Sequence, residues 1–142
     1  MPKPIEISRY VMGGVYTFAG IMHFVAPSFY VQIIPDYLEP LGPMLLVYLS
    51  GVAEIVCGVG LFIPKTRRLA AWATIALLVA VFPANLYMAT HNVQIQGLPS
   101  WMEQPGTVGR WMRLPFQAVF IWWAWLFTKP DRAAGTSAAT EA

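Results

Sequence analysis

The sequence predicts an all-α protein, a transmembrane four-helix bundle, and three observations carry this prediction. The 142 residues are 57% hydrophobic and 11% charged, whereas about a quarter of the residues of a soluble domain are charged. Four apolar stretches cover residues 10–25, 44–63, 69–88 and 114–127. These stretches are continuous rather than alternating, which favours membrane helices over the strands of a barrel. We expect one domain over residues 1–130 and a disordered, small and polar tail over residues 131–142.

The apolar stretches differ in how well their lengths match a bilayer. Twenty residues, as in 44–63, span about 30 Å as a helix, which is the thickness of the hydrocarbon core. The fourth stretch covers only about 21 Å. Extending it back to Val108 places Arg113 inside the outer leaflet, and Pro115 should kink the helix near that end. We expect Arg110 to extend to the head groups and Arg113 to be buried.

The connections between the stretches set the orientation. Seven of the nine Lys and Arg residues lie at the two termini and in the tight turn 64–68, and only Arg110 and Arg113 fall on the side of the long connections 27–43 and 89–109. By the positive-inside rule, both termini and the tight turn are cytoplasmic. We therefore expect a multi-pass protein of the bacterial inner (plasma) membrane. Its expected partner is the lipid bilayer. Residues 27–38 are amphipathic and begin with a proline, which predicts a short helix or re-entrant lid at the outer interface.

Glu54 is the only charged residue in the stretch 44–63, and it lies near the middle. A carboxyl group at the bilayer midplane is costly unless it is protonated, paired or faces a cavity. The remaining polar side chains of the stretches fall in their outer halves. The predicted cluster contains His23, Glu54, Asn85, Arg113 and Gln117. We expect Arg113, about 7 Å above Glu54 along the normal, to be its first partner.

Small residues recur at helical spacing beside the cluster. Gly13, Thr17 and Gly20 precede His23 on one face, and Gly51 and Gly58 flank Glu54 on another. Small residues mark the faces where membrane helices approach closely. We therefore expect these two helices to pack through the faces that carry His23 and Glu54. The cluster has two interpretations: a structural polar contact that fixes helix register, or the polar floor of a ligand pocket open to the outer side.

Several function classes find no support in the sequence. The net charge of +2 gives no argument for nucleic acid as a partner. The single cysteine, Cys57, excludes an intramolecular disulfide, a Cys-x-x-Cys pair and a cysteine-based zinc site. We find no pattern for nucleophilic catalysis, no phosphate loop and no metal constellation. No catalytic residues, metal or resident cofactor are predicted, with quinone as a possible ligand, and we expect no catalysis by the chain alone.

Several short segments along the chain form a recognisable set in their order and spacing: 20–27, 29–30, 33–35, 50–55, 58–61, 65–68, 82–85 and 113–117. Together they resemble the DoxX family of small bacterial four-helix membrane proteins. They extend from the first stretch to the fourth and include every member of the polar cluster. The resemblance implies a four-helix membrane bundle associated with quinol oxidase, thiosulfate:quinone oxidoreductase or redox-stress complexes. A related branch assists disulfide formation, a role that one cysteine cannot perform alone.

Three functions are compatible with these features. The first is an accessory or assembly subunit of a membrane redox system, in which partner subunits supply the chemistry. The second is a binder of a quinone or another small lipophilic ligand in an outer-leaflet pocket. The third is a small transporter, for which the chain lacks a clear inverted repeat or a pair of broken helices.

Overall fold

The computed structural model describes residues 1–103 and 106–130, except for the side chains of residues 102 and 103. The predicted disordered tail lies outside the described residues. The described chain is all-α, as predicted, and contains no strand. Its helices are α1 (Pro4–Val25), α2 (Pro27–Val31), the 3-10 helix η1 (Asp36–Leu41), α3 (Pro43–Phe62), α4 (Arg67–Thr90), α5 (Ser100–Glu103), α6 (Thr107–Trp111) and α7 (Arg113–Leu126).

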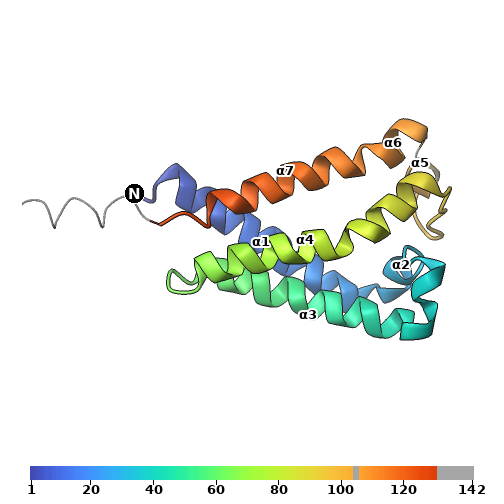
Figure 1. Ribbon diagram of the computed structural model, residues 1–142, viewed down its shortest axis with the longest axis horizontal. Coiled ribbons are helices and arrows are strands. Elements are labelled where there is room, and N and C mark those ends of the chain that lie inside the picture. The colour runs from blue at the N-terminus through green and yellow to red at the C-terminus, as the bar shows by residue number, and fades with distance from the viewer. Residues whose placement is uncertain (104–105, 131–142) are drawn as a thin grey trace, which may run out of the picture.

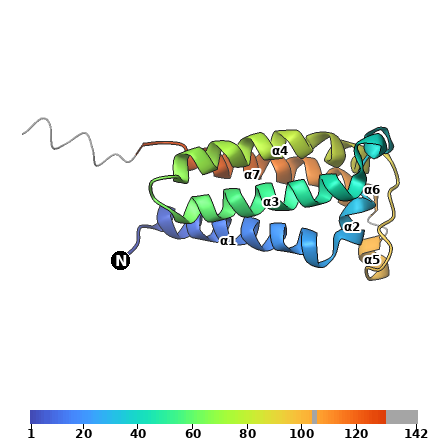
Figure 2. The ribbon, with the colours of Figure 1, turned by 90° about the horizontal axis from the view of Figure 1, so that it is seen from below.

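The longest helices, α1, α3, α4 and α7, lie along one common axis (Figures 1 and 2). The short helices α2, α5 and α6 gather at one end of this arrangement, which we call the loop end. The N-terminus and the turn between α3 and α4 lie at the opposite end, called the terminal end. Along the chain, α1 packs against α3, α3 against α4, and α4 against α7.

Two helices begin where local signals predict a start. Pro4 is the first residue of α1, and the Lys3 backbone N–H donates a hydrogen bond of 2.9 Å to the Glu6 carboxylate. A proline costs nothing at this position because its missing N–H would have no partner in the helix. Helix α3 begins at Pro43, directly after Gly42, whose φ of +81° glycine adopts readily. Because α1 begins at Pro4, it is six residues longer at its start than the predicted stretch 10–25.

The interface of α1 and α3 is built from glycines that allow the two backbones to approach closely. A Cβ atom on Gly20 would lie 2.6 Å from the Gly51 carbonyl oxygen, and one on Gly13 would lie 2.9 Å from that of Gly58. These are the faces that the small-residue spacing predicted. The close approach brings His23 of α1 beside Glu54 of α3.

The terminal end holds the main hydrophobic core. Met12 and Tyr16 of α1 pack there with Leu61, Ala71, Ala124 and Phe127. Two polar contacts join the helices at this end: the Arg9 guanidinium donates to the Leu61 carbonyl at 2.7 Å, and Trp123 Nε1 donates to Ser8 Oγ at 2.7 Å. Because the Ser8–Trp123 bond ties α1 to α7 here, the two helices meet at the terminal end. Toward the loop end they diverge (Figure 1).

A break between α6 and α7 sits where Pro115 was expected to kink the fourth stretch. Helix α6 ends at Trp111, and α7 begins at Arg113. Pro115 has no N–H to donate to the Trp111 carbonyl four residues earlier, so a continuous helix would lose that hydrogen bond. Pro115 lies instead in the first turn of α7, where no partner is needed. As a result, Arg113 is the first residue of α7.

Two of the long helices have the length and the apolarity needed to cross a membrane. They are α3 and α4, of 20 and 24 residues. Only 28% and 17% of the residues in their most apolar windows are buried, whereas a core helix of a soluble protein is mostly buried. The other two long helices do not meet the same criteria: α1 includes Arg9 and His23, and α7 has only 14 residues.

Candidate functional site

Glu54 of α3 faces His23 of α1 across the glycine-lined interface. His23 Nδ1 lies 3.3 Å from Glu54 Oε2, and the two side chains are 9% and 18% exposed. His23 Nδ1 also lies 2.9 Å from the Ala19 carbonyl oxygen. Because a carbonyl oxygen can only accept, Nδ1 carries a proton, and in the neutral ring Nε2 is free to accept. Glu54 Oε2 is buried and has no hydrogen-bond partner among the described residues.

Tyr30 of α2 covers the histidine from the loop end. Its ring stacks on that of His23, with centroids 3.7 Å apart and planes inclined by 23°. Burial raises the pKa of the Tyr30 hydroxyl, and the nearby Glu54 carboxylate raises that pKa further. The hydroxyl therefore stays neutral at any physiological pH. The amphipathic segment that was predicted as a short helix or lid contributes this contact.

Asn85 and Gln117 join α4 to α7 through a directed pair of hydrogen bonds. Gln117 Nε2 donates to the Leu78 carbonyl oxygen, and Asn85 Nδ2 donates to Gln117 Oε1 at 2.8 Å. Gln117 is buried, whereas Asn85 is half-buried. Both amide groups are therefore held in one orientation, with Asn85 Oδ1 left over as an acceptor.

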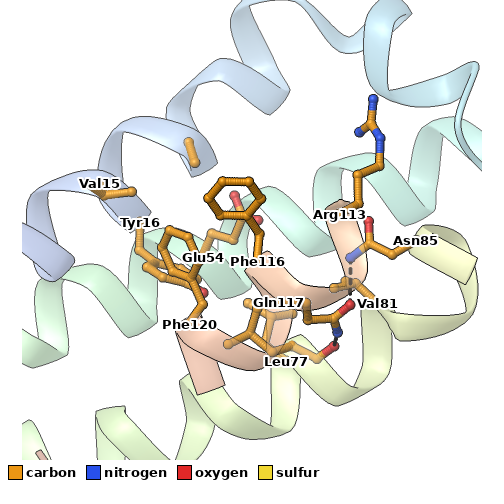
Figure 3. Close-up of a pocket in the computed structure, with 12 residues that line it drawn as sticks. Val15, Tyr16, Glu54, Leu77, Val81, Asn85, Arg113, Phe116, Gln117 and Phe120 are labelled. Atoms are coloured by element: carbon orange, nitrogen blue, oxygen red, sulfur yellow. Dashed lines mark hydrogen bonds between the residues drawn. The ribbon is translucent and has the colours of Figure 1, made fainter. Parts of the chain in front are cut away.

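Three adjoining cavities surround these polar groups. The main cavity, of about 280 Å³, lies between α1, α4 and α7 (Figure 3). The histidine cavity, of about 240 Å³, contains His23 in its wall, and the loop cavity, of about 350 Å³, is closed partly by Ile95 and Leu98. Glu54 and Asn85 line both the main and the histidine cavities, while Tyr30 lines both the histidine and the loop cavities. Ligand-sized hollows of this kind are typically mostly apolar with a few convergent polar groups.

Arg113 lines the main and the loop cavities from the first turn of α7. Its guanidinium makes no hydrogen bond or ion pair with any residue that the structure describes. Figure 3 shows its guanidinium directed away from the Glu54 carboxyl group. The expected Glu54–Arg113 ion pair is therefore not formed. The helix break at Met112 makes Arg113 the first residue of α7. The ionisable neighbour of Glu54 is His23.

The structure thus gathers all five members of the predicted cluster around adjoining cavities. Sequence reasoning missed the aromatic wall of the main cavity, which consists of Tyr16, Phe116 and Phe120. Tyr16 and Phe120 meet edge to face, with centroids 6.3 Å apart. Phe116 and Phe120 are one helical turn apart and flank Gln117, a spacing that could have indicated a shared face. The stack of Tyr30 on His23 was also missed, because nothing in the local sequence of Tyr30 indicates it.

The chemistry available at this site is that of recognition. Hydrogen-bond acceptors, one guanidinium and aromatic walls surround a hollow large enough for a small molecule. Among the described residues, no group of three or more His, Cys, Asp or Glu side chains is arranged to hold a metal ion. Cys57 is buried as a free thiol one turn from Glu54.

Comparison with known proteins places the chain in a family. Neither a curated protein nor a solved structure matches it. A family model described as "Domain of unknown function (DUF8561)" matches residues 12–128, a region that includes every residue of the polar cluster and nearly all of the long helices. The chain therefore belongs to the DUF8561 family.

Proposed function

We propose that this protein is a four-helix bundle of the bacterial plasma membrane, with α1, α3, α4 and α7 as its spans and both termini in the cytoplasm. The basic turn between α3 and α4 lies at the same end as the N-terminus, in agreement with the positive-inside rule. Apolar side chains point outward from the long helices, among them Phe18, Val56 and Leu69, which are 66%, 65% and 74% exposed. A lipid environment would cover them.

Within that membrane protein, the main cavity is the binding site of a small lipophilic ligand with a polar head. One observation carries the proposal: four polar side chains line a hollow of about 280 Å³ whose other walls are apolar and aromatic, namely Glu54, Asn85, Arg113 and Gln117. Ionisable groups are retained inside membranes chiefly where they serve a function. A purely structural cluster would be expected to satisfy its own polar groups, yet Glu54 Oε2 is buried without a hydrogen-bond partner among the described residues.

The ligand enters sideways from the bilayer, between α1 and α7. These helices are tied together at the terminal end by the Ser8–Trp123 hydrogen bond and diverge toward the loop end (Figure 1). Val15 of α1 and Phe116 of α7 line the main cavity and are 43% and 59% exposed. Exposed apolar side chains at a cavity edge suit a molecule that arrives dissolved in lipid.

The resemblance of the sequence motifs to the DoxX family supports a quinone-type molecule as one candidate ligand. It also supports a second candidate function, an accessory or assembly subunit of a membrane redox complex. The Asn85–Gln117–Leu78 hydrogen bonds favour this alternative, since they link α4 to α7 without any ligand. In that case the cavities are incidental, and partner subunits supply the chemistry.

Ligand-induced stabilisation of the purified protein separates the two functions. Ligands that bind only the folded state raise its stability, by about 2.7 kcal/mol at a hundred times the Kd. We expect decyl-benzoquinone or para-decylphenol to raise the Tm of the wild type in detergent. The rise should shrink in Arg113→Ala and Glu54→Gln and persist in Lys65→Ala, whose exposed side chain lies at the terminal end. No shift with either probe, or equal shifts in all variants, would favour the accessory role.

A further inference from the structure

We propose that the polar head of the ligand carries hydroxyl groups, as in an alcohol or a phenol, and that these groups donate hydrogen bonds to acceptors in the wall of the histidine cavity. This inference rests on the proposed binding function and narrows its ligand class. It follows from the direction of the hydrogen bonds that the protein already makes. Each of these bonds uses a donor and leaves an acceptor open.

His23 contributes the first acceptor. Its Nδ1 donates to the Ala19 carbonyl oxygen at 2.9 Å, which fixes the tautomer. Nε2 then carries a lone pair and has no hydrogen-bond partner among the described residues. The ring is held in place by the Tyr30 stack on one face. The side chain lines the histidine cavity.

Asn85 contributes the second acceptor. The orientation of its amide group is set by Gln117, which is itself oriented by the Leu78 carbonyl oxygen. The Leu78 carbonyl oxygen requires a donor, so Gln117 presents Nε2 to it and turns Oε1 toward Asn85. Asn85 must then present Nδ2 to Gln117, which leaves Oδ1 as an acceptor with no partner among the described residues. Asn85 lines both the histidine and the main cavities.

Glu54 contributes the third acceptor at the junction of the same two cavities. A carboxyl group offers an acceptor oxygen in either protonation state. Its Oε2 atom is buried without a hydrogen-bond partner, an arrangement that a donor from a ligand would relieve. The hydroxyls of Ser50 and Tyr30 also line the histidine cavity and can accept or donate.

A carbonyl head group would bring more acceptors to this wall and leave its acceptors unsatisfied. A cationic head group also fits poorly, because Arg113 lines two of the adjoining cavities and because an ammonium ion is costly to desolvate among apolar side chains such as Ile33, Val47 and Val81. A neutral hydroxyl supplies the donor at the smallest desolvation cost. Its apolar body would then occupy the main cavity beside Phe116 and Phe120.

A matched pair of probes tests the inference. Para-decylphenol and para-decylanisole share one shape, but the methyl ether lacks the hydroxyl donor. We expect the wild type in detergent to bind the phenol about tenfold more tightly than the anisole, the effect of one good hydrogen bond. In Glu54→Gln, where an amide replaces one carboxyl oxygen by a donor, the ratio should fall severalfold. Ala73→Phe, in an apolar groove that shares no lining residue with the three cavities, should keep the wild-type ratio.

The outcomes separate this inference from the function beneath it. Equal binding of phenol and anisole to the wild type would overturn the preference for hydroxyl donors and leave the binding site in place. Tighter binding of para-decylbenzylamine than of the phenol would also overturn it, in favour of a cation. If none of the probes bound, the proposed binding function itself would fail.

Discussion

His23 Nδ1 and Glu54 Oε2 lie 3.3 Å apart, and this contact joins α1 to α3 at the depth of the cavities. The same histidine nitrogen donates to the Ala19 carbonyl oxygen, and the ring stacks on Tyr30. The His23 side chain therefore contacts the Glu54 carboxyl group, donates a hydrogen bond to the backbone of its own helix and packs against α2. The pair expected from the sequence, Glu54 with Arg113, would have placed the partner of the carboxyl group on α7 instead of α1.

Loss of the histidine should loosen this arrangement. We expect His23→Ala to lower the free energy of unfolding by about 1–3 kcal/mol, because it leaves Glu54 without its neighbour and Tyr30 without its stack. Thermal or denaturant unfolding in detergent measures the effect. His91→Ala is the control, since His91 also stacks on a tyrosine, Tyr87, at 4.2 Å between centroids but is exposed. Similar losses of unfolding free energy in both variants would show that the His23–Glu54 contact does not contribute to stability.

The glycine interface of α1 and α3 should tolerate no added methyl group. In Gly20→Ala, the new Cβ would meet the Gly51 carbonyl oxygen at 2.6 Å and the Ile55 side chain at 2.7 Å. Relief of these contacts requires the helices to separate, at a cost of about 1–3 kcal/mol. Gly14→Ala is the matched control on the same helix, where no atom lies within 4 Å. It should be neutral or stabilising by about 0.5–1 kcal/mol. Equal Tm values for the two variants would argue against this packing.

The amide pair between α4 and α7 should behave as one unit. Gln117→Leu removes the hydrogen bonds to Asn85 and to the Leu78 carbonyl, and we expect it to cost about 1–3 kcal/mol. In the double variant with Asn85→Leu, the loss should be smaller than the sum of the single losses by about 1 kcal/mol. A double-mutant cycle from unfolding curves measures this coupling. Strictly additive losses would mean that the Asn85–Gln117 bond adds no stability.

The proposed orientation predicts which residues are reached from each side of the membrane. Cys57 is the only cysteine and is buried, so Cys57→Ala gives a background free of thiols. In this background, Glu39→Cys in η1 should react with a membrane-impermeant maleimide added to intact cells, and Lys65→Cys only after lysis. Both native side chains are exposed, so access to the reagent is comparable. Reaction of Lys65→Cys in intact cells would reverse the proposed topology.

The all-α class and the packing faces of α1 and α3 could be predicted because they follow from local composition. Continuous apolar stretches predict helices, and the spacing of Gly13, Gly20, Gly51 and Gly58 predicts where two of them meet. Helix ends were less predictable. The start of α1 depends on a proline and a capping contact in the polar segment before the apolar stretch. Hydropathy carries no information about such a segment.

The grouping of the polar cluster in space could be predicted, but the pairing of its side chains could not. Depth along the helices brought His23, Glu54, Asn85 and Gln117 to one level, and the structure has them around adjoining cavities. Depth alone could not foresee the helix break at Met112, which turns Arg113 toward the loop end. Nor could it foresee the stack of Tyr30 on His23, a tertiary contact with no local signal. Side-chain direction depends on these details rather than on sequence spacing.

Filling the main cavity tests the central claim, ligand binding between α1 and α7, most directly. Ala19 lines this cavity, and Ala19→Phe would occupy the space with a ring. Ala73→Phe places the same ring in the apolar groove between α3 and α4. We would measure equilibrium binding of para-decylphenol and decyl-benzoquinone to the purified wild type and both variants. The account predicts that the wild type and Ala73→Phe bind the phenol equally well, whereas Ala19→Phe loses at least tenfold in affinity. Unchanged binding by Ala19→Phe, or no binding of either probe by the wild type, would contradict it.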